Sequence, residues 1–98
     1  MSARKEVEDL VVLGPLPDEN ADEEAIAIHA GLLGKIARPV SDEEAALLVG
    51  LFGPDDCYGL AWTLLHLIES APGGIPLKVE PIHSDGSWLH LLWARSHR

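Results

Sequence analysis

One stretch of the chain, residues 57–68, is apolar at nearly every position and constrains the fold more than any other feature. Three residues interrupt this apolar run: Gly59, Thr63 and His66. An α-helix of this composition has apolar side chains around most of its circumference, so it must be buried on most sides. It is too short to cross a bilayer, which needs about 20 apolar residues. We therefore predict a buried helix at about Asp56–Ser70, at the centre of a small domain.

The polar positions of this central helix fall on a single face. Gly59, Thr63, His66 and Ser70 follow one another at spacings of four, three and four, which places them in one stripe along the helix. The simplest interpretation of His66 is a packing residue whose ring hydrogen-bonds a carbonyl or a hydroxyl, such as that of Thr63 or Ser70. We expect Thr63, His66 and Ser70 to form the polar side of an otherwise apolar helix.

Two more helices are predicted before it, each with acidic residues in the first turn, where the helix dipole favours them. One follows Asp22-Glu23-Glu24 and ends before Pro39. Its expected buried stripe is Ala25, Ile28, His29, Leu32 and Ile36, widened by Ile26 and Leu33. The other begins at Ser41, which forms a capping box with Glu44. Its expected buried face is Ala45, Leu48, Val49 and Phe52. We interpret the recurrence of Asp-Glu-Glu-Ala as two independent helix starts rather than a duplication.

The two ends of the chain are less regular. Residues 7–13 fit either a short helix or a strand. Residues 1–20 belong to the predicted domain, with a loosely ordered N-terminal segment as the alternative. Two prolines exclude a continuous helix over residues 75–82, whereas Trp88–His97 has the pattern of an amphipathic helix. These elements predict an all-α fold: one domain over residues 1–98, with four to five short helices packed around the central one.

The chain is acidic, and its charge is unevenly distributed. Its 16 acidic and 7 basic residues give a net charge of −9, and 13 of the acids lie in residues 1–60. Such a surface repels nucleic-acid phosphate and anionic membranes and attracts basic proteins. We predict a basic protein partner and no binding to nucleic acid or membrane. The candidate contacts are Asp22, Glu23, Asp42 and Glu43. The alternative is that these acids only begin helices and keep the protein soluble.

Tryptophan supplies three of the five aromatic residues of the chain. Trp62 is expected in the core. Trp88 and Trp93 lie about 140° apart around a helix, so one can be buried while the other faces outward. An exposed tryptophan beside Arg95 would anchor a protein partner. With Leu92, the two would also serve as the contact patch of a homodimeric adaptor. The alternative is that both pack on the core.

No catalytic or cofactor motif is present. The 9 glycines form no phosphate loop, and no two histidines have the spacing of zinc ligands on one helix. Cys57, expected one or two residues into the central helix, is interpreted as a small buried residue. We predict no metal, no cofactor and no enzymatic activity. The alternative is a small metal- or histidine-dependent enzyme that uses His66 with Cys57 or Glu69.

Two segments resemble known sequences. Phe52–Gly73 reads FGPDDCYGLAWTLLHLIESAPG, and Trp88–Arg95 follows with the pattern W-L-x-L-L-x-x-R. Together they resemble small acidic uncharacterised proteins that are common in bacterial genomes. The resemblance covers less than half of the chain and implies no activity. It supports the predicted fold and a bacterial source, although Pro76 and Pro81 stand where the resembled proteins are helical.

Size, charge and the lack of catalytic motifs together favour a non-enzymatic protein-interaction module. Its most concrete form is a small acidic inhibitor of the immunity or antitoxin type, which covers a basic partner and occludes it. The charged start of the chain is not followed by an apolar export segment, which indicates a cytoplasmic protein.

Overall fold

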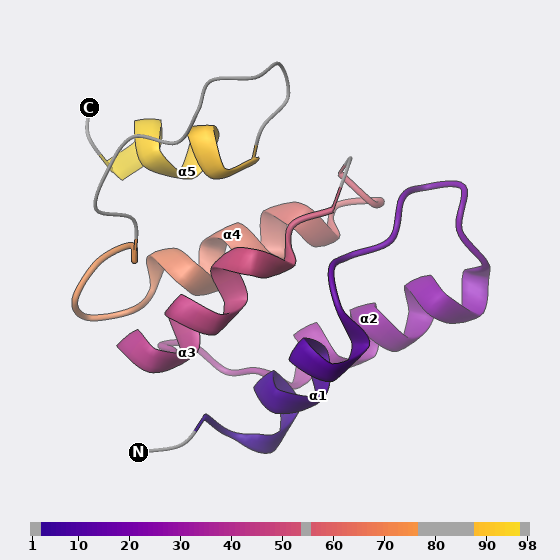
Figure 1. The fold of residues 1–98 in the computed structure, drawn as a ribbon, viewed down its shortest axis with the longest axis horizontal. Coiled ribbons are helices and arrows are strands. Elements are labelled where there is room, and N and C mark those ends of the chain that lie inside the picture. The colour runs from indigo at the N-terminus through magenta and orange to yellow at the C-terminus, as the bar shows by residue number, and fades with distance from the viewer. Residues whose placement is uncertain (1–2, 54–55, 77–87, 97–98) are drawn as a thin grey trace.

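The regular secondary structure of the described part of the chain is entirely helical (Figure 1). The computed structural model describes residues 3–53, 56–76 and 88–96. Its elements in chain order are α1 (Lys5–Leu13), α2 (Glu23–Lys35), α3 (Asp42–Leu48), the 3-10 turn η1 (Val49–Leu51), α4 (Leu60–Glu69) and α5 (Trp88–Ser96). The all-α prediction is confirmed, and the segment left open between helix and strand is the helix α1.

Helix α4 is the centre of the packing, as predicted. It contacts α2, α3 and α5. Its buried residues are Ala61, Leu64, Leu65, Leu67 and Ile68. The Cα atoms extend 17 Å along the shortest axis of the molecule against 36 and 35 Å along the other two, which corresponds to about two layers of helices. In so thin a molecule the other helices cannot enclose α4, and one side of it remains at the surface.

Three details of the predicted helices are wrong, and each has a structural reason. Helix α4 begins at Leu60, later than predicted, because residues 56–59 form a turn before it. Trp62 is 39% exposed rather than in the core, because the side of α4 that carries it is uncovered. On α2, Ile28 is 45% exposed, because it lies at the edge of the predicted stripe and no neighbouring helix of the described part covers it. The buried residues His29 and Leu33 of α2, and Ile36 directly after it, all belong to the predicted stripe.

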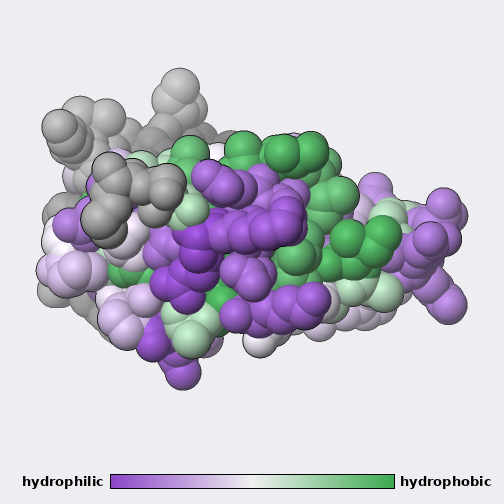
Figure 2. All heavy atoms as spheres, turned by 90° about the horizontal axis from the view of Figure 1, so that it is seen from below, coloured by the Kyte–Doolittle hydropathy of each residue, from purple (hydrophilic) through white to green (hydrophobic). Residues whose placement is uncertain are grey.

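Part of the apolar surface remains exposed. In Figure 2, apolar residues gather in one area of the face seen from below, beside a band of hydrophilic side chains. On α1, Val7 and Leu10 are buried, whereas Val12 is 87% exposed. The other large exposed apolar residues of α1 and α2 are Val11, Leu13 and Ile28. Helix α1 therefore carries more apolar surface than the described part of the domain buries.

A buried carboxylate ties α1 to α3. Glu44, in the first turn of α3, is only 4% exposed. It accepts hydrogen bonds from Nε of Arg4 at 2.8 Å, from Nη2 at 3.0 Å and from the backbone N–H at 3.0 Å. The backbone N–H of Ser41 donates to Glu44 at 2.9 Å, while the hydroxyl of Ser41 accepts from the backbone N–H of Glu44. The predicted capping box is therefore confirmed, with Arg4 as an additional partner.

The carboxylate of Glu44 makes stability depend on pH. The hydrogen bond from the Arg4 side chain, against the effect of burial, lowers the pKa of Glu44 from 4.5 to about 2. A depressed pKa in the folded state stabilises the fold above the unfolded-state value, and this stabilisation is lost as the pH falls toward 2. We expect the free energy of unfolding to fall by about 2–3 kcal/mol from this group between pH 5 and pH 2.

Urea denaturation across that pH range measures the effect in the unmodified protein and in Glu44→Gln. The variant should be less stable at pH 7, because Arg4 loses its charged partner, and its stability should change less between pH 5 and pH 2. Glu8→Gln, an exposed glutamate of α1, serves as the control and should leave the pH dependence unchanged. Parallel curves for the protein and Glu44→Gln would contradict the assignment.

Candidate functional site

The four acidic residues predicted to contact a partner do not form one surface. Asp22 and Glu23 lie at the start of α2, whereas Asp42 and Glu43 lie at the start of α3. These two helix starts are at opposite ends of the molecule (Figure 1). All four residues are exposed. A partner of small contact area can therefore engage one pair or the other, so each pair has to be assessed separately.

At the start of α2 the acidic residues border a surface hollow of about 440 Å³. We call this the acidic hollow. Its lining combines carboxylates, small apolar side chains and one aromatic ring: Glu19, Ala21, Glu23, Ile26, Ala27 and Tyr58. Tyr58 is 69% exposed. The hollow thus offers an apolar base, an aromatic ring and negative charge in one place.

Tyr58 is held in position by an uncommon turn. Its φ angle is 54° and that of Cys57 is 48°, both in the left-handed region, and Gly59 follows with 92°. The backbone N–H of Gly59 donates to Oδ2 of Asp56 at 3.1 Å, which closes the turn. Left-handed backbone costs a non-glycine residue about 1 kcal/mol or more. The turn has two consecutive residues in this conformation. It directs Cys57 into the core and Tyr58 to the surface.

Two hydrogen bonds join Tyr58 to the segment before α2. Its hydroxyl donates to the backbone oxygen of Glu19 at 2.9 Å, and its backbone N–H donates to Oε2 of Glu19 at 3.3 Å. These bonds link residues far apart in the sequence and fix the phenol ring against the Glu19 side of the hollow. Neither residue is a predicted site residue. The available signal was Asp56 with Gly59 three residues later, a spacing typical of a turn.

Two of the acidic residues at the start of α3 make contacts within the protein. Glu44 pairs with Arg4, and Oδ1 of Asp42 accepts a hydrogen bond from the backbone N–H of Gly73 at 2.8 Å. At the start of α2, by contrast, the side chain of Asp22 makes no capping hydrogen bond. The two Asp-Glu-Glu-Ala segments therefore differ in their contacts, and the one at α2 is the better candidate for binding.

The tryptophans form a cluster between α4 and α5. The ring of Trp88 stacks on Phe52 with centroids 6.0 Å apart and meets Trp62 edge to face at 5.2 Å. Arg95 donates to Glu69 from Nε at 2.7 Å, and its guanidinium lies 6.0 Å from the centroid of the Trp62 ring. Leu92 is fully buried, and Trp88 and Trp93 are partly buried. The more exposed tryptophan beside Arg95 is thus Trp62, and Trp88 helps to attach α5.

The predicted polar stripe divides into exposed and inward-facing parts. Thr63 and His66 are exposed, whereas Ser70 is partly buried and accepts a hydrogen bond from the backbone N–H of Val40 at 3.1 Å. The hydroxyl of Ser70 donates to Leu67 O, and that of Thr63 donates to Gly59 O. The hydroxyls of Thr63 and Ser70, which were expected partners of His66, therefore donate to backbone oxygens. The centroid of the His66 ring lies 6.0 Å from that of the Trp62 ring.

The residues of the enzyme alternative are not assembled into a metal site. Within residues 3–53, 56–76 and 88–96, no group of three His, Cys, Asp or Glu side chains could hold a metal ion. Cys57 is buried and lies in the turn before α4, not inside the helix as predicted. His83 and His97 lie outside the described residues. Among the described helices, none has the length and hydropathy needed to cross a bilayer.

Comparison of the chain with protein-family models, with curated proteins and with solved structures finds no match. The chemistry of the described residues is therefore the basis of the functional argument.

Because Asp42 and Asp22 differ in their contacts, their replacement should lower the free energy of unfolding by different amounts. Asp42→Ala should lower the free energy of unfolding by about 1 kcal/mol, because the backbone N–H of Gly73 loses its acceptor. Asp22→Ala should cost less than about 0.5 kcal/mol, because no capping bond is lost. Gly73→Ala places a Cβ 2.6 Å from Oδ2 of Asp42 and should destabilise the protein too. Equal effects of the two aspartate variants in urea denaturation would contradict these roles.

Proposed function

We propose that this chain is a non-enzymatic protein-interaction module that captures a basic partner protein at the acidic hollow. The observation that carries the proposal is the combination of Tyr58 with Glu19 and Glu23 around one hollow at the start of α2. Helix starts commonly carry acids for reasons of stability alone. An exposed aromatic ring fixed among them is not required for that purpose.

The hollow suits a lysine or arginine side chain. The aliphatic part of such a side chain would lie on Ala21, Ile26 and Ala27. Its charged end would reach the carboxylates of Glu19 and Glu23 and the face of the Tyr58 ring, which attracts cations. Aromatic residues and charge pairs of this kind are frequent centres of binding energy at protein interfaces.

The charge of the whole chain supports the same function. A net charge of −9 raises the rate at which a basic protein meets this surface and orients its approach. Three exposed acids in succession, Asp22, Glu23 and Glu24, concentrate that field at the start of α2. The most concrete form of the proposal is a small inhibitor of the immunity or antitoxin type. It would act by covering a basic surface with which its partner holds a negatively charged substrate.

Capture from a lysate of the source organism tests the binding. The immobilised protein should retain a basic protein at about 50 mM salt and release it at about 500 mM, because screening weakens the charge contacts. Glu23→Gln and Tyr58→Ala should each reduce capture by about tenfold. Glu8→Gln removes the same charge from another exposed position in a first turn and should have little effect.

Two results would sink the proposal: no basic protein is retained at low salt, or Glu8→Gln and Glu23→Gln reduce capture equally. The second result would mean that Glu23 contributes only to the overall negative charge and that the acidic hollow is not a specific binding site. The inhibitor form requires a further assay, in which one equivalent of the protein abolishes the activity of the captured partner. Undiminished activity in the complex would leave a binding module without inhibition.

A further inference from the structure

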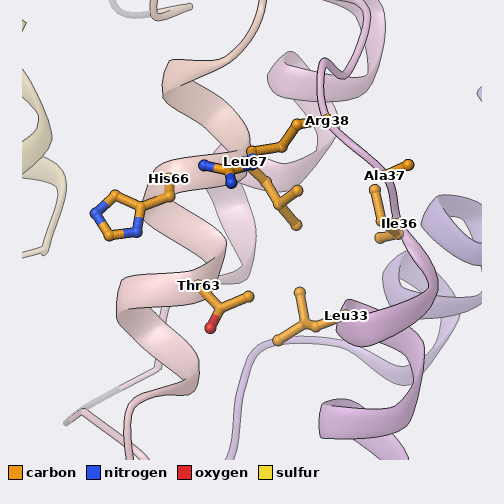
Figure 3. A pocket seen from close by; sticks show the side chains of 7 residues that line it. All are labelled: Leu33, Ile36, Ala37, Arg38, Thr63, His66 and Leu67. Carbon is orange, nitrogen blue, oxygen red and sulfur yellow. The ribbon is translucent and has the colours of Figure 1, made fainter.

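A second concave surface lies at the other end of α2. It is a groove of about 400 Å³ between the end of α2, the segment that follows it and α4. We call it the α2–α4 groove. Figure 3 shows the seven residues that line it: Leu33, Ile36, Ala37, Arg38, Thr63, His66 and Leu67. Leu33, Ile36 and Leu67 are each less than a tenth exposed, so they form an aliphatic base that the exposed residues border.

The border of the groove carries one cation, Arg38, that has no ion-pair partner among the described residues. The described part of the chain contains five lysines and arginines, of which three form ion pairs: Arg4 with Glu44, Lys5 with Asp9 and Arg95 with Glu69. The other two, Lys35 and Arg38, form no ion pair within the described residues. Both are exposed and lie at the end of α2. Among the described residues of this acidic chain, the two cations without an ion pair therefore lie close together in the sequence, and one of them, Arg38, lines the groove.

The backbone beside Arg38 also has hydrogen-bonding capacity left. Residues 36–38 are not helical, and Ile36 has extended angles, φ −90° and ψ 111°. The carbonyl oxygen of Ala37 accepts from Nη1 of Arg4 at 3.0 Å. No hydrogen bond joins the backbone N–H of Ala37 or Arg38 to another residue of the described part. Two backbone donors and a guanidinium therefore lie within two consecutive residues at the edge of the groove.

The side chains in Figure 3 are arranged for an anion at one end of the groove and an aliphatic group on its base. Arg38 extends from the segment after α2 toward α4, and Thr63 and Leu33 face each other across the groove. The ring of His66 points to the other side of α4, away from Leu33 and Ile36. The polar side chain that extends over the groove is thus Arg38, whereas Thr63 turns its methyl group toward Leu33 and donates its hydroxyl to Gly59 O.

We propose that the α2–α4 groove binds the free carboxyl terminus of a partner chain whose last residue is aliphatic. The guanidinium of Arg38 matches the two oxygens of a carboxylate, and free backbone N–H groups are a recurring means of binding a chain terminus. The aliphatic side chain would lie on Leu33, Ile36 and Leu67. The groove is open to solvent and cannot surround a small molecule as enclosed ligand pockets do, so the end of a longer chain fits it better.

This site is independent of the acidic hollow. The two lie toward opposite ends of α2, a helix of 13 residues. The lining of the acidic hollow reaches Ala27 and that of the groove begins at Leu33, six residues further on, which is about 9 Å along the helix. They also differ in the charge they bind. Failure of one site in an experiment would therefore not imply failure of the other.

The test uses a defined probe, the tripeptide acetyl-Ala-Ala-Leu with a free carboxylate, titrated into ¹⁵N-labelled full-length protein at pH 7.5 to about 10 mM. We expect saturable shifts of the backbone signals of Ala37, Arg38 and Thr63. The same tripeptide with a C-terminal amide should bind at least about tenfold more weakly, because the charge-assisted hydrogen bonds are lost. Acetate, which has no aliphatic side chain, should also bind at least about tenfold more weakly.

Variants complete the test. Arg38→Gln should weaken binding of the free-acid tripeptide at least about tenfold, and because Arg38 is exposed and unpaired among the described residues the variant should fold normally. Lys5→Gln removes a cation at the start of α1 and should leave binding unchanged. The proposal is overturned if the acid and amide peptides bind alike, if acetate binds as well as the tripeptide, if Arg38→Gln has no effect, or if the groove signals do not move.

Discussion

The fold depends on one buried carboxylate and on the hydrogen bonds that it accepts. Glu44 is almost fully buried, and a carboxylate in that position is strongly unfavourable unless it is paired and hydrogen-bonded. Arg4 and Ser41 supply four donors to it. The same guanidinium donates to the carbonyl oxygens of Ala37 and Pro39. One ion pair thus connects the start of α1, the segment between α2 and α3, and the first turn of α3, and through that segment it helps to position Arg38.

The thinness of the molecule decides which side chains remain available for binding. Helix α4 has the composition of a fully enclosed helix, but with about two layers of helices its outer side is covered only in part. Trp62, Thr63 and His66 are therefore exposed. The cluster of Trp62, Trp88 and Arg95 covers part of this side and attaches α5 to α4. The remaining part borders the α2–α4 groove.

The sequence predicted the positions of the helices better than it predicted which side of each helix faces the core. The capping box at Ser41 and the central position of α4 follow from side-chain spacing and composition, which act within one segment. Which side of a helix faces inward depends on its neighbours, so Ile28 and Trp62 were placed wrongly. The turn at residues 56–59 was missed because its two left-handed residues, Cys57 and Tyr58, are types that rarely adopt this conformation. The acidic hollow depends on that turn and could not be predicted without it.

The two ends of α2 carry opposite charges, with Asp22, Glu23 and Glu24 at the start and Lys35 at the end. The helix dipole favours this arrangement, so stability alone explains the sign of the charge at each end. It does not explain Tyr58, whose backbone conformation is costly and whose ring is 69% exposed. A side chain so exposed adds little to the stability of its own core. Contact with the basic partner proposed above would account for an aromatic ring fixed at that cost beside Glu19 and Glu23.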